Sequence, residues 1–133
     1  MKVDSFLLNL TSDDRDRLMA FYRDVVGLPP QEGMEEFALQ LPQGASLAFD
    51  GHSETHGRTK EPSRVLINLF VEDINASQAE LEAKGVKFFR DKGVEYWGGI
   101  ISSFEDPDGN YVQLIQFDPS LAREEDAPAT ATA

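Results

Sequence analysis

The chain repeats a short pattern, and an internal repeat restricts the architectures open to its 133 residues. Residues 7–10 read LLNL and residues 66–69 read LINL, and each is a short apolar strand signal. Polar capping residues follow both, and then a helical segment that ends near a glycine, Gly27 or Gly85. The repeat therefore predicts two similar β-α-β-β modules, each with room for one more strand.

The segments between these signals supply the remaining elements. Apolar residues at helical spacing predict one helix over about residues 13–26 and another over about 75–84. Asn75 and Gln78 stand at the spacing of a capping box, which would begin the second helix. The turn sequences PQG and PDG separate the later strands. These strands are expected at FALQL (37–41), SLAFD (46–50), VKFFR (86–90), IISSF (100–104) and YVQLIQF (111–117).

The length and the order of the elements predict one α+β domain over residues 1–118. Module one covers 1–50, a polar linker rich in turn-forming residues covers 51–63, and module two covers 64–118. The segment 119–133 has no apolar period, so we expect it to be a flexible acidic and Ala-Thr tail.

Charge and composition exclude several classes of function. The net charge of −12 repels nucleic-acid phosphates and anionic lipid headgroups, and at long range it favours cationic ligands. Because the chain has no cysteine, it can form neither disulfides nor zinc–thiolate sites. No apolar run has the length of a signal sequence or a membrane span. We therefore expect a cytoplasmic protein without nucleic-acid or membrane partners.

Two motifs resemble those of a known family. LMAFYRDVVGL (18–28) after a strand, and FEDPDGNYVQLIQF (104–117) near the end, are similar to motifs of the vicinal oxygen chelate superfamily. This superfamily includes glyoxalase I, extradiol dioxygenases, fosfomycin-resistance enzymes and bleomycin-binding proteins. The resemblance covers about residues 3–118. It implies two tandem βαβββ modules whose curved sheets enclose a cleft, usually in a homodimer.

The resemblance also implies positions for a metal site. Enzymes of the family hold a divalent metal with His, Gln or Glu side chains on the first and last strands of each module. These positions fall on Leu7, Leu66 and Gln113, and in module one on Ser46 or Ala45, where the register stays open. Since one amide does not hold a catalytic ion against water, we expect no metal and no other cofactor.

Two other arrangements could supply metal donors. A shift of two residues would bring Asn9 and Asn68 to the first-strand positions, but two asparagines and a glutamine remain a poor set for a transition metal. His52 and His56 are spaced i, i+4 with Asp50 nearby, which would suit a metal on a helix. The glycines around them predict a loop instead, so we interpret this segment as solvated linker.

Without a metal, a cleft binds by shape, aromatic contact and a few polar groups. In VEYWGG (94–99), Tyr96 and Trp97 precede two glycines, and drug-binding relatives have a similar WG loop beside the cavity. The alternative is that these aromatic side chains pack on a dimer interface. Strand alternation nominates further ligand-facing residues: Asn9, Thr11, Phe49, Asn68, Phe70, Ile101, Ser103, Gln113 and Ile115.

Three functions are compatible with these patterns. The first is a metal-free homodimer of the bleomycin-resistance type, which sequesters an aromatic or cationic natural product or metabolite. The second is an enzyme, either a metal-dependent lyase or dioxygenase with an atypical site, or an acid–base catalyst using Glu105 or a tyrosine. The third is an interaction module with an empty cleft. The sequence identifies no catalytic residue.

Overall fold

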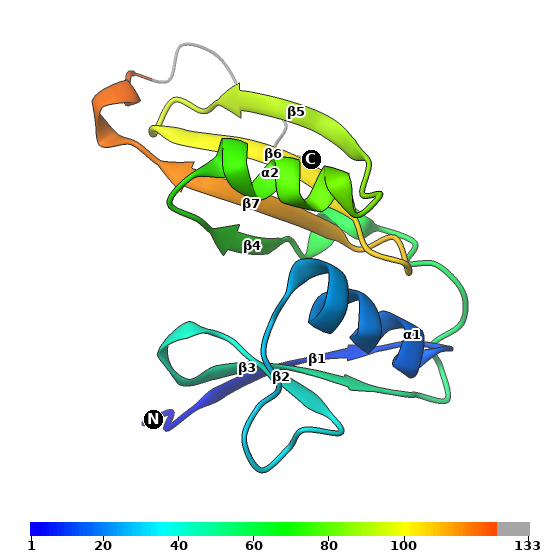
Figure 1. The fold of residues 1–133 in the computed structure, drawn as a ribbon. Helices are drawn as coiled ribbons and strands as arrows, with labels where there is room; N and C mark the ends of the chain where they lie inside the picture. The colour runs from blue at the N-terminus through cyan, green and yellow to red at the C-terminus, as the bar shows by residue number, and fades with distance from the viewer. Residues whose placement is uncertain (125–133) are drawn as a thin grey trace. The chain divides into compact units, whose positions relative to one another are not determined.

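The computed structural model describes residues 1–124 and divides into two compact units, Met1–Arg58 and Thr59–Ala133, of which 125–133 lie outside the described part. In each unit one helix lies against one face of a β-sheet (Figure 1). The boundary falls inside the linker predicted at residues 51–63. None of the helices among the described residues has the length and apolar character needed to cross a membrane.

The first unit has a three-stranded sheet with a helix of mixed type. The strands lie in the order β1-β3-β2 across the sheet. β3 is parallel to β1 on one side and antiparallel to β2 on the other. The elements are β1 (Phe6–Thr11), α1 (Arg15–Ala20), the π-helical η1 (Phe21–Val26), β2 (Ala38–Gln40), the 3-10 turn η2 (Pro42–Gly44) and β3 (Ala45–Asp50).

The helix predicted over residues 13–26 is confirmed as α1 followed directly by η1. The carboxylate of Asp14 accepts from the backbone N–H of Arg17 at 3.1 Å and so caps the first turn. Gly27 ends the helix with φ of 90°, a conformation that glycine adopts without strain. Leu18 and Tyr22 are fully buried, so the predicted apolar stripe faces the sheet.

The additional strand expected in module one is reduced to a single bridge. Within the described residues of the first unit, only Pro30 pairs outside the named strands, opposite Leu39. Pro29 and Pro30 have no N–H to donate to a neighbouring strand, so a regular ladder cannot form through them.

The second unit has a four-stranded sheet in the order β4-β7-β6-β5, with β4 and β7 parallel and the other pairs antiparallel. Figure 1 shows α2 lying across one face of this sheet. The strands predicted here are confirmed, the last with the same boundaries and the others with boundaries shifted by one to four residues. The elements are η3 (Pro62–Arg64), β4 (Ile67–Phe70), α2 (Ile74–Ala83), β5 (Phe88–Val94), β6 (Gly99–Glu105), β7 (Tyr111–Phe117) and η4 (Pro119–Leu121).

The start of α2 differs from the predicted capping box. Asp73 is the N-cap, because its carboxylate accepts from the N–H of Ala76 at 3.1 Å. Gln78 is buried and instead donates to Asp91 of β5 at 3.1 Å, which ties the helix to the sheet. The pKa of Asp91 is lowered from its ordinary value, first by the backbone N–H of Lys92 and then by Gln78.

The turn between β6 and β7 is organised by one buried carboxylate. Asp106 accepts from the backbone N–H groups of Asp108 and Asn110 and from the Asn110 amide, each at 2.9 Å. These bonds fix the register in which β7 returns beside β6. The predicted PDG hairpin turn is therefore confirmed.

The hairpin between β5 and β6 carries Tyr96 and Trp97. The N–H of Glu95 donates to the carbonyl of Gly99 at 2.8 Å, and Gly98 takes a φ of 94°. The Trp97 indole folds over Gly99 and stacks on Phe117, with ring centroids 6.1 Å apart and planes at 25°. Gly99 therefore leaves the space in which the indole lies.

The beginning of the predicted tail packs against this hairpin. The N–H of Asp118 donates to the carbonyl of Gly98 at 2.9 Å, and that of Arg123 donates to the carbonyl of Tyr96 at 2.7 Å. Between them Pro119–Leu121 forms a 3-10 turn capped by Asp118. Residues 119–123 are thus held in place, and the rest of the tail from 125 lies outside the described residues.

Replacing Gly99 with alanine tests the packing of Trp97. A Cβ at this position would lie 2.1 Å from the indole, so the ring must move. We expect a red-shifted emission from the single tryptophan and a loss of about 1–3 kcal/mol in the free energy of unfolding by urea. Gly51→Ala is the control, since the nearest atom to its Cβ is 3.9 Å away. Unchanged emission in Gly99→Ala would contradict this packing.

Candidate functional site

The two faces of the second sheet are distinguished by one hydrogen bond. The side chain of Gln116 on β7 accepts from the N–H of Ile74 at the start of α2, at 2.9 Å. Gln116 therefore points to the helix, and because side chains alternate along a strand, Gln113 and Ile115 point to the other side. We name that side of the sheet the helix-free face.

A row of polar residues crosses the helix-free face from edge to edge. Strand pairing places Asn68 of β4 opposite Gln113 of β7, Gln113 opposite Ser103 of β6, and Ser103 opposite Arg90 of β5. Paired residues point to the same face, so these four side chains form one line, which we name the polar row. The Gln113 amide donates to the Ser103 hydroxyl at 3.4 Å. Gln113 and Ser103 are buried, and Asn68 is exposed at the sheet edge.

Arg90 joins this row because β5 contains an irregularity. The pairing between β5 and β6 shifts between Phe88 and Arg90. Phe88 contacts Phe104, whereas Phe89 contacts Tyr111 with ring centroids 4.7 Å apart. Tyr111 is on the helix-free face, so the bulge puts the consecutive residues Phe89 and Arg90 on that same face.

The guanidinium of Arg90 forms an ion pair with Glu95. The two groups are 2.9 Å apart, and the Arg90 and Glu95 side chains are 17% and 2% exposed. Gly93 makes room for the pair, because a Cβ there would lie 2.8 Å from an Arg90 nitrogen. Sequence reasoning missed Arg90 and Glu95. In a regular strand, the side chain of Arg90 would point to the other face of the sheet. The contact with Glu95 can therefore be expected only when the bulge in β5 is known.

An apolar row lies beside the polar one and ends at a hollow. Phe70 is paired with Ile115, which is paired with Ile101, and both isoleucines are buried. Phe70, at the sheet edge, is 66% exposed. A hollow of about 590 Å³, which we name the aromatic hollow, is lined by Phe70, Val71, Glu72, Gln116 and Phe117. Phe117 is 54% exposed, and Trp97 stacks on it.

Of the eleven nominated ligand-binding residues, six are together on one face of the second unit and two are on the adjoining hairpin. The six are Asn68, Phe70, Ile101, Ser103, Gln113 and Ile115, and the two are Tyr96 and Trp97.

The three nominated residues of the first unit have different surroundings. Asn9 is exposed, opposite Ala48, and the Thr11 hydroxyl is 2.7 Å from that of Thr55. Phe49 is paired with Leu10, so it points away from Asn9, and it packs on Tyr22 with centroids 5.6 Å apart. Phe49 therefore belongs to the core of this unit, because the parallel register gives β3 the opposite alternation from the one expected.

The strand register also gives the neighbours of the family's metal positions. Ser46 lies opposite Leu7, and Ala48 lies opposite Asn9. In the second unit Asn68 lies opposite Gln113. When the repeat is aligned so that Asn9 matches Asn68, their strand partners Ala48 and Gln113 match as well. In that alignment the module-one counterpart of Gln113 is Ala48, whereas the sequence suggested Ser46 or Ala45.

The side chains at these positions do not fit a transition metal. Leucine and alanine have no donor atoms, and the amides of Asn9, Asn68 and Gln113 are weak ligands for such ions. Across residues 1–124 no group of three or more His, Asp or Glu side chains is placed to hold a metal ion. His52 and His56 lie in an irregular exposed segment, where His56 is 3.6 Å from Asp13.

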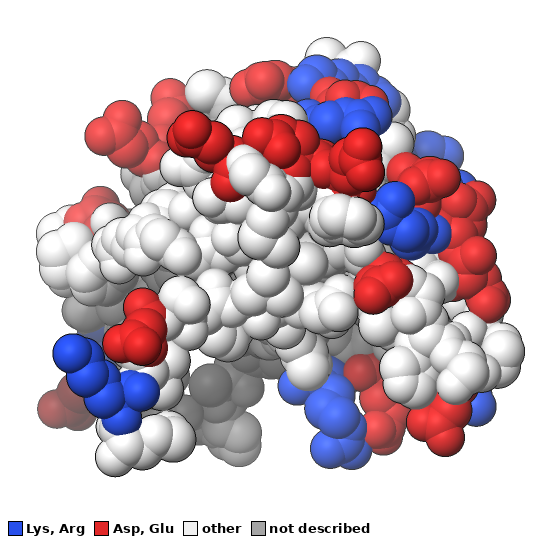
Figure 2. Space-filling model, turned by 90° about the horizontal axis from the view of Figure 1, so that it is seen from below, with Lys and Arg blue, Asp and Glu red and all other residues white. Residues whose placement is uncertain are grey.

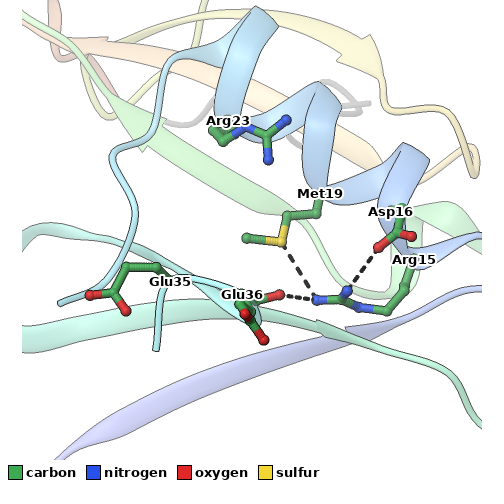
Figure 3. Close-up of a pocket in the computed structure, with 6 residues that line it drawn as sticks. All are labelled: Arg15, Asp16, Met19, Arg23, Glu35 and Glu36. Carbon is green, nitrogen blue, oxygen red and sulfur yellow. Dashed lines mark hydrogen bonds and ion pairs between the residues drawn. The ribbon is translucent and has the colours of Figure 1, made fainter. Parts of the chain in front are cut away.

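A second hollow, of about 450 Å³, lies beside α1 and is lined by Met19 and five charged residues (Figure 3). Arg15 donates to Asp16 at 2.8 Å, to the sulfur of Met19 at 3.6 Å and to the carbonyl of Glu36. At its rim the Asp24 carboxylate raises the pKa of Arg23, and the backbone N–H of Gly33 lowers the pKa of Glu35. These contacts attach α1 to the segment before β2.

The surface reflects the excess of acidic residues. On the face drawn in Figure 2, a band of uncharged side chains runs between groups of acidic ones, with fewer basic side chains. The field of the whole chain therefore favours cations at long range.

Comparisons with known proteins agree with this architecture. The family model described as Glyoxalase/Bleomycin resistance protein/Dioxygenase superfamily matches residues 3–114. A search of curated proteins finds no match.

Solved structures with this fold include three bacterial proteins. TnmS3, an antibiotic binding protein from Streptomyces sp. CB03234, is 25% identical, with 89% of this chain and 99% of that chain covered and a TM-score of 0.66. A superfamily member from Sphaerobacter thermophilus DSM 20745 is 20% identical, with 87% and 98% covered and a TM-score of 0.67. A glyoxalase/bleomycin resistance protein/dioxygenase from Nocardioides is 20% identical, with 98% and 90% covered and a TM-score of 0.66.

The family match spans most of the chain, and the repeated sheet-and-helix units have the fold of these structures. The chain therefore belongs to the Glyoxalase/Bleomycin resistance protein/Dioxygenase superfamily.

Proposed function

We propose that this chain is a metal-free binding protein that holds an aromatic small molecule, a natural product or a metabolite, without changing it chemically. The aromatic hollow carries this proposal. Phe70 and Phe117 line it and are 66% and 54% exposed, so an aromatic guest can cover apolar surface that water now contacts. Aromatic contacts contribute about 0.5–1.5 kcal/mol beyond that burial.

The residues at the family's metal positions support binding without coordination. Leu7 and Leu66 offer carbon where inner-sphere donors would be needed, Gln113 offers one amide, and the Ser46 hydroxyl donates to Gln31 at 3.0 Å. Asn68, the exposed member of the polar row, is two residues before Phe70 on β4 and adds an amide near the aromatic hollow, and a few polar groups beside apolar surface are usual in a small-molecule site.

The likeness to an antibiotic binding protein supports the class of ligand. TnmS3 is 25% identical over nearly its whole length. We therefore propose that natural products of the antibiotic type are the first molecules to test, and that sequestering one of them would confer resistance.

We also propose a homodimer, supported by exposed apolar residues on the two edge strands. β1 and β4 are each at the edge of a sheet. Phe6 and Leu7 of β1 are 61% and 42% exposed, and Val65, just before β4, is 58% exposed. Exposed apolar edge strands are surfaces that proteins cover by pairing.

For the homodimer, sedimentation velocity at micromolar concentration should give a species of twice the 14.8 kDa of one chain. Leu7→Asp should shift it to one chain, because a carboxylate on an edge strand opposes pairing. Val65→Asp tests the other edge in the same way. A wild-type protein that sediments as one chain at every concentration would rule out the dimer.

Metal titration tests the absence of coordination. Calorimetry with Zn²⁺ and Ni²⁺ should show no stoichiometric ion with submicromolar affinity, because the family positions lack donors. The variant His52→Ala with His56→Ala is the control, since it removes surface imidazoles that bind ions weakly. A stoichiometric ion that persists in this control and is lost in Gln113→Leu would overturn the metal-free proposal.

Binding of planar aromatic dyes tests the aromatic hollow. A dye seated against Phe117 should quench Trp97, the single tryptophan, because the two rings stack. Phe70→Ala should weaken binding about tenfold, the equivalent of about 1.4 kcal/mol, with little change in stability because the ring is exposed. Phe37→Ala, which removes another exposed ring in the first unit, is the control. Equal affinities of the two variants would move the site elsewhere, and recovery of altered dye would indicate catalysis.

A further inference from the structure

We propose that Asp50 is a site of spontaneous covalent modification, at which the backbone nitrogen of Gly51 attacks the Asp50 side chain and converts the residue to isoaspartate. Aspartate followed by glycine is the pair most open to this reaction, because glycine has no Cβ to obstruct its own nitrogen. The chain has two such pairs, Asp50-Gly51 and Asp108-Gly109, and no Asn-Gly pair. Their surroundings in the structure differ, and only the first pair is arranged for the reaction.

The reaction is a ring closure followed by hydrolysis. The Gly51 nitrogen bonds to Cγ of Asp50, one Cγ–O bond breaks, and the oxygen leaves as water with the Gly51 amide proton and one proton from solvent. The product is a five-membered succinimide ring that joins the side chain to the backbone. Water then opens the ring at one of its two carbonyl carbons. Opening at Cγ restores aspartate, whereas opening at the backbone carbon gives isoaspartate, in which the main chain runs through the former side chain.

At Asp50 the reacting groups are already in contact. The N–H of Gly51 donates to Oδ1 of Asp50 at 2.8 Å. A base within about 2.6–3.2 Å of a donor is close enough to accept its proton, so the carboxylate is placed to take the amide proton that the reaction removes. The same contact holds the nitrogen beside the carboxyl group that it attacks, and a ring closure is faster when its two ends are already together.

This pair is also accessible to water. Both Asp50 and Gly51 are exposed, and Gly51 begins the irregular segment that follows β3. The nearest atom to a Cβ built on Gly51 is 3.9 Å away, so the surroundings leave room for the ring. Water can therefore reach both carbonyl carbons of the succinimide.

The second pair, Asp108-Gly109, lacks these conditions. The N–H of Gly109 donates to the carbonyl of Asp106 at 2.9 Å, so this proton is directed away from the preceding carboxylate. Gly109 is buried. The carboxylate of Asp106 also accepts from the N–H groups of Asp108 and Asn110, and a ring at Asp108 would disturb the turn that these bonds hold. Asp108 is therefore an internal reference made of the same two residue types.

Isoaspartate at position 50 would alter the first unit where β1 and β3 end. Asp50 is paired with Thr11, and its carbonyl accepts from the N–H of Ser12 at 2.9 Å. The Ser12 hydroxyl in turn accepts from the N–H of Asp14, the N-cap of α1. In isoaspartate this carbonyl becomes a carboxylate outside the main chain, and the main chain gains one atom. Modified chains should therefore unfold at a lower temperature than fresh ones.

The test is to age the full chain for several weeks at body temperature and neutral pH in water enriched in oxygen-18. Each ring opening adds one labelled oxygen to the residue. Peptide mapping with a protease that cleaves before aspartate but not before isoaspartate then locates the product by mass spectrometry. We expect isoaspartate to form at position 50 at least about tenfold faster than at position 108, the equivalent of about 1.4 kcal/mol in the barrier.

Two variants separate this chemistry from a general loss of structure. Asp50→Glu keeps the charge but would need a six-membered ring, so modification at position 50 should stop and the aged protein should unfold at the same temperature as the fresh one. Asp108→Glu is the matched control, and it should leave the rate at position 50 unchanged. Circular dichroism of the fresh proteins verifies that both variants are folded.

Each outcome bears on the inference alone. Equal rates at positions 50 and 108, or no labelled isoaspartate at position 50 after ageing, would overturn it. Labelled isoaspartate at position 50, with a fall in unfolding temperature that is absent from Asp50→Glu, would support it. Because none of these measurements uses a ligand, the inference can fail while the proposed binding function stands.

Discussion

The parallel pairing of the first and last strands of each unit is the constraint on which the rest depends. β1 with β3 and β4 with β7 bring together residues that are far apart in the chain, and the intervening helix covers one face of the resulting sheet. The other face is left to side chains whose positions follow from this register. In the second unit it aligns Asn68 with Gln113, and the antiparallel strands extend that line to Ser103 and Arg90. A slip of one residue in β7 would turn Gln113 toward α2 and break the line.

Much of this fold follows from local sequence signals. The repeat predicted two similar units, the apolar stripe predicted the helix ending at Gly27, and the PDG turn predicted the hairpin that Asp106 fixes. What could not be predicted depends on relations between strands. Phe49 was assigned to the ligand-facing side because alternation within β3 does not reveal its parity relative to β1. Arg90 was missed because a bulge interrupts the alternation of β5. Pro29 and Pro30 lack the N–H groups that a strand ladder needs. They therefore explain why module one has a single bridge in place of a fourth regular strand.

The site shows how a family scaffold can keep its geometry while its chemistry changes. Within each unit the first and last strands are paired, and at the positions that the sequence resemblance implies for metal ligands they bear leucine, serine and amide side chains. The polar groups that remain cross the sheet to a single ion pair, which is itself neutral overall. An ion pair buried to this extent is expensive to desolvate, so it contributes little net stability.

The aromatic hairpin has a further dependence outside the family match. That match ends at residue 114, whereas Gly98 and Tyr96 are bonded to Asp118 and Arg123. The placement of the hairpin that carries Trp97 therefore depends partly on residues 118–123, which follow the last strand of the sheet. A chain cut ahead of Arg123 would lose the bond to the Tyr96 carbonyl and loosen this hairpin, while every strand of both sheets would still be present.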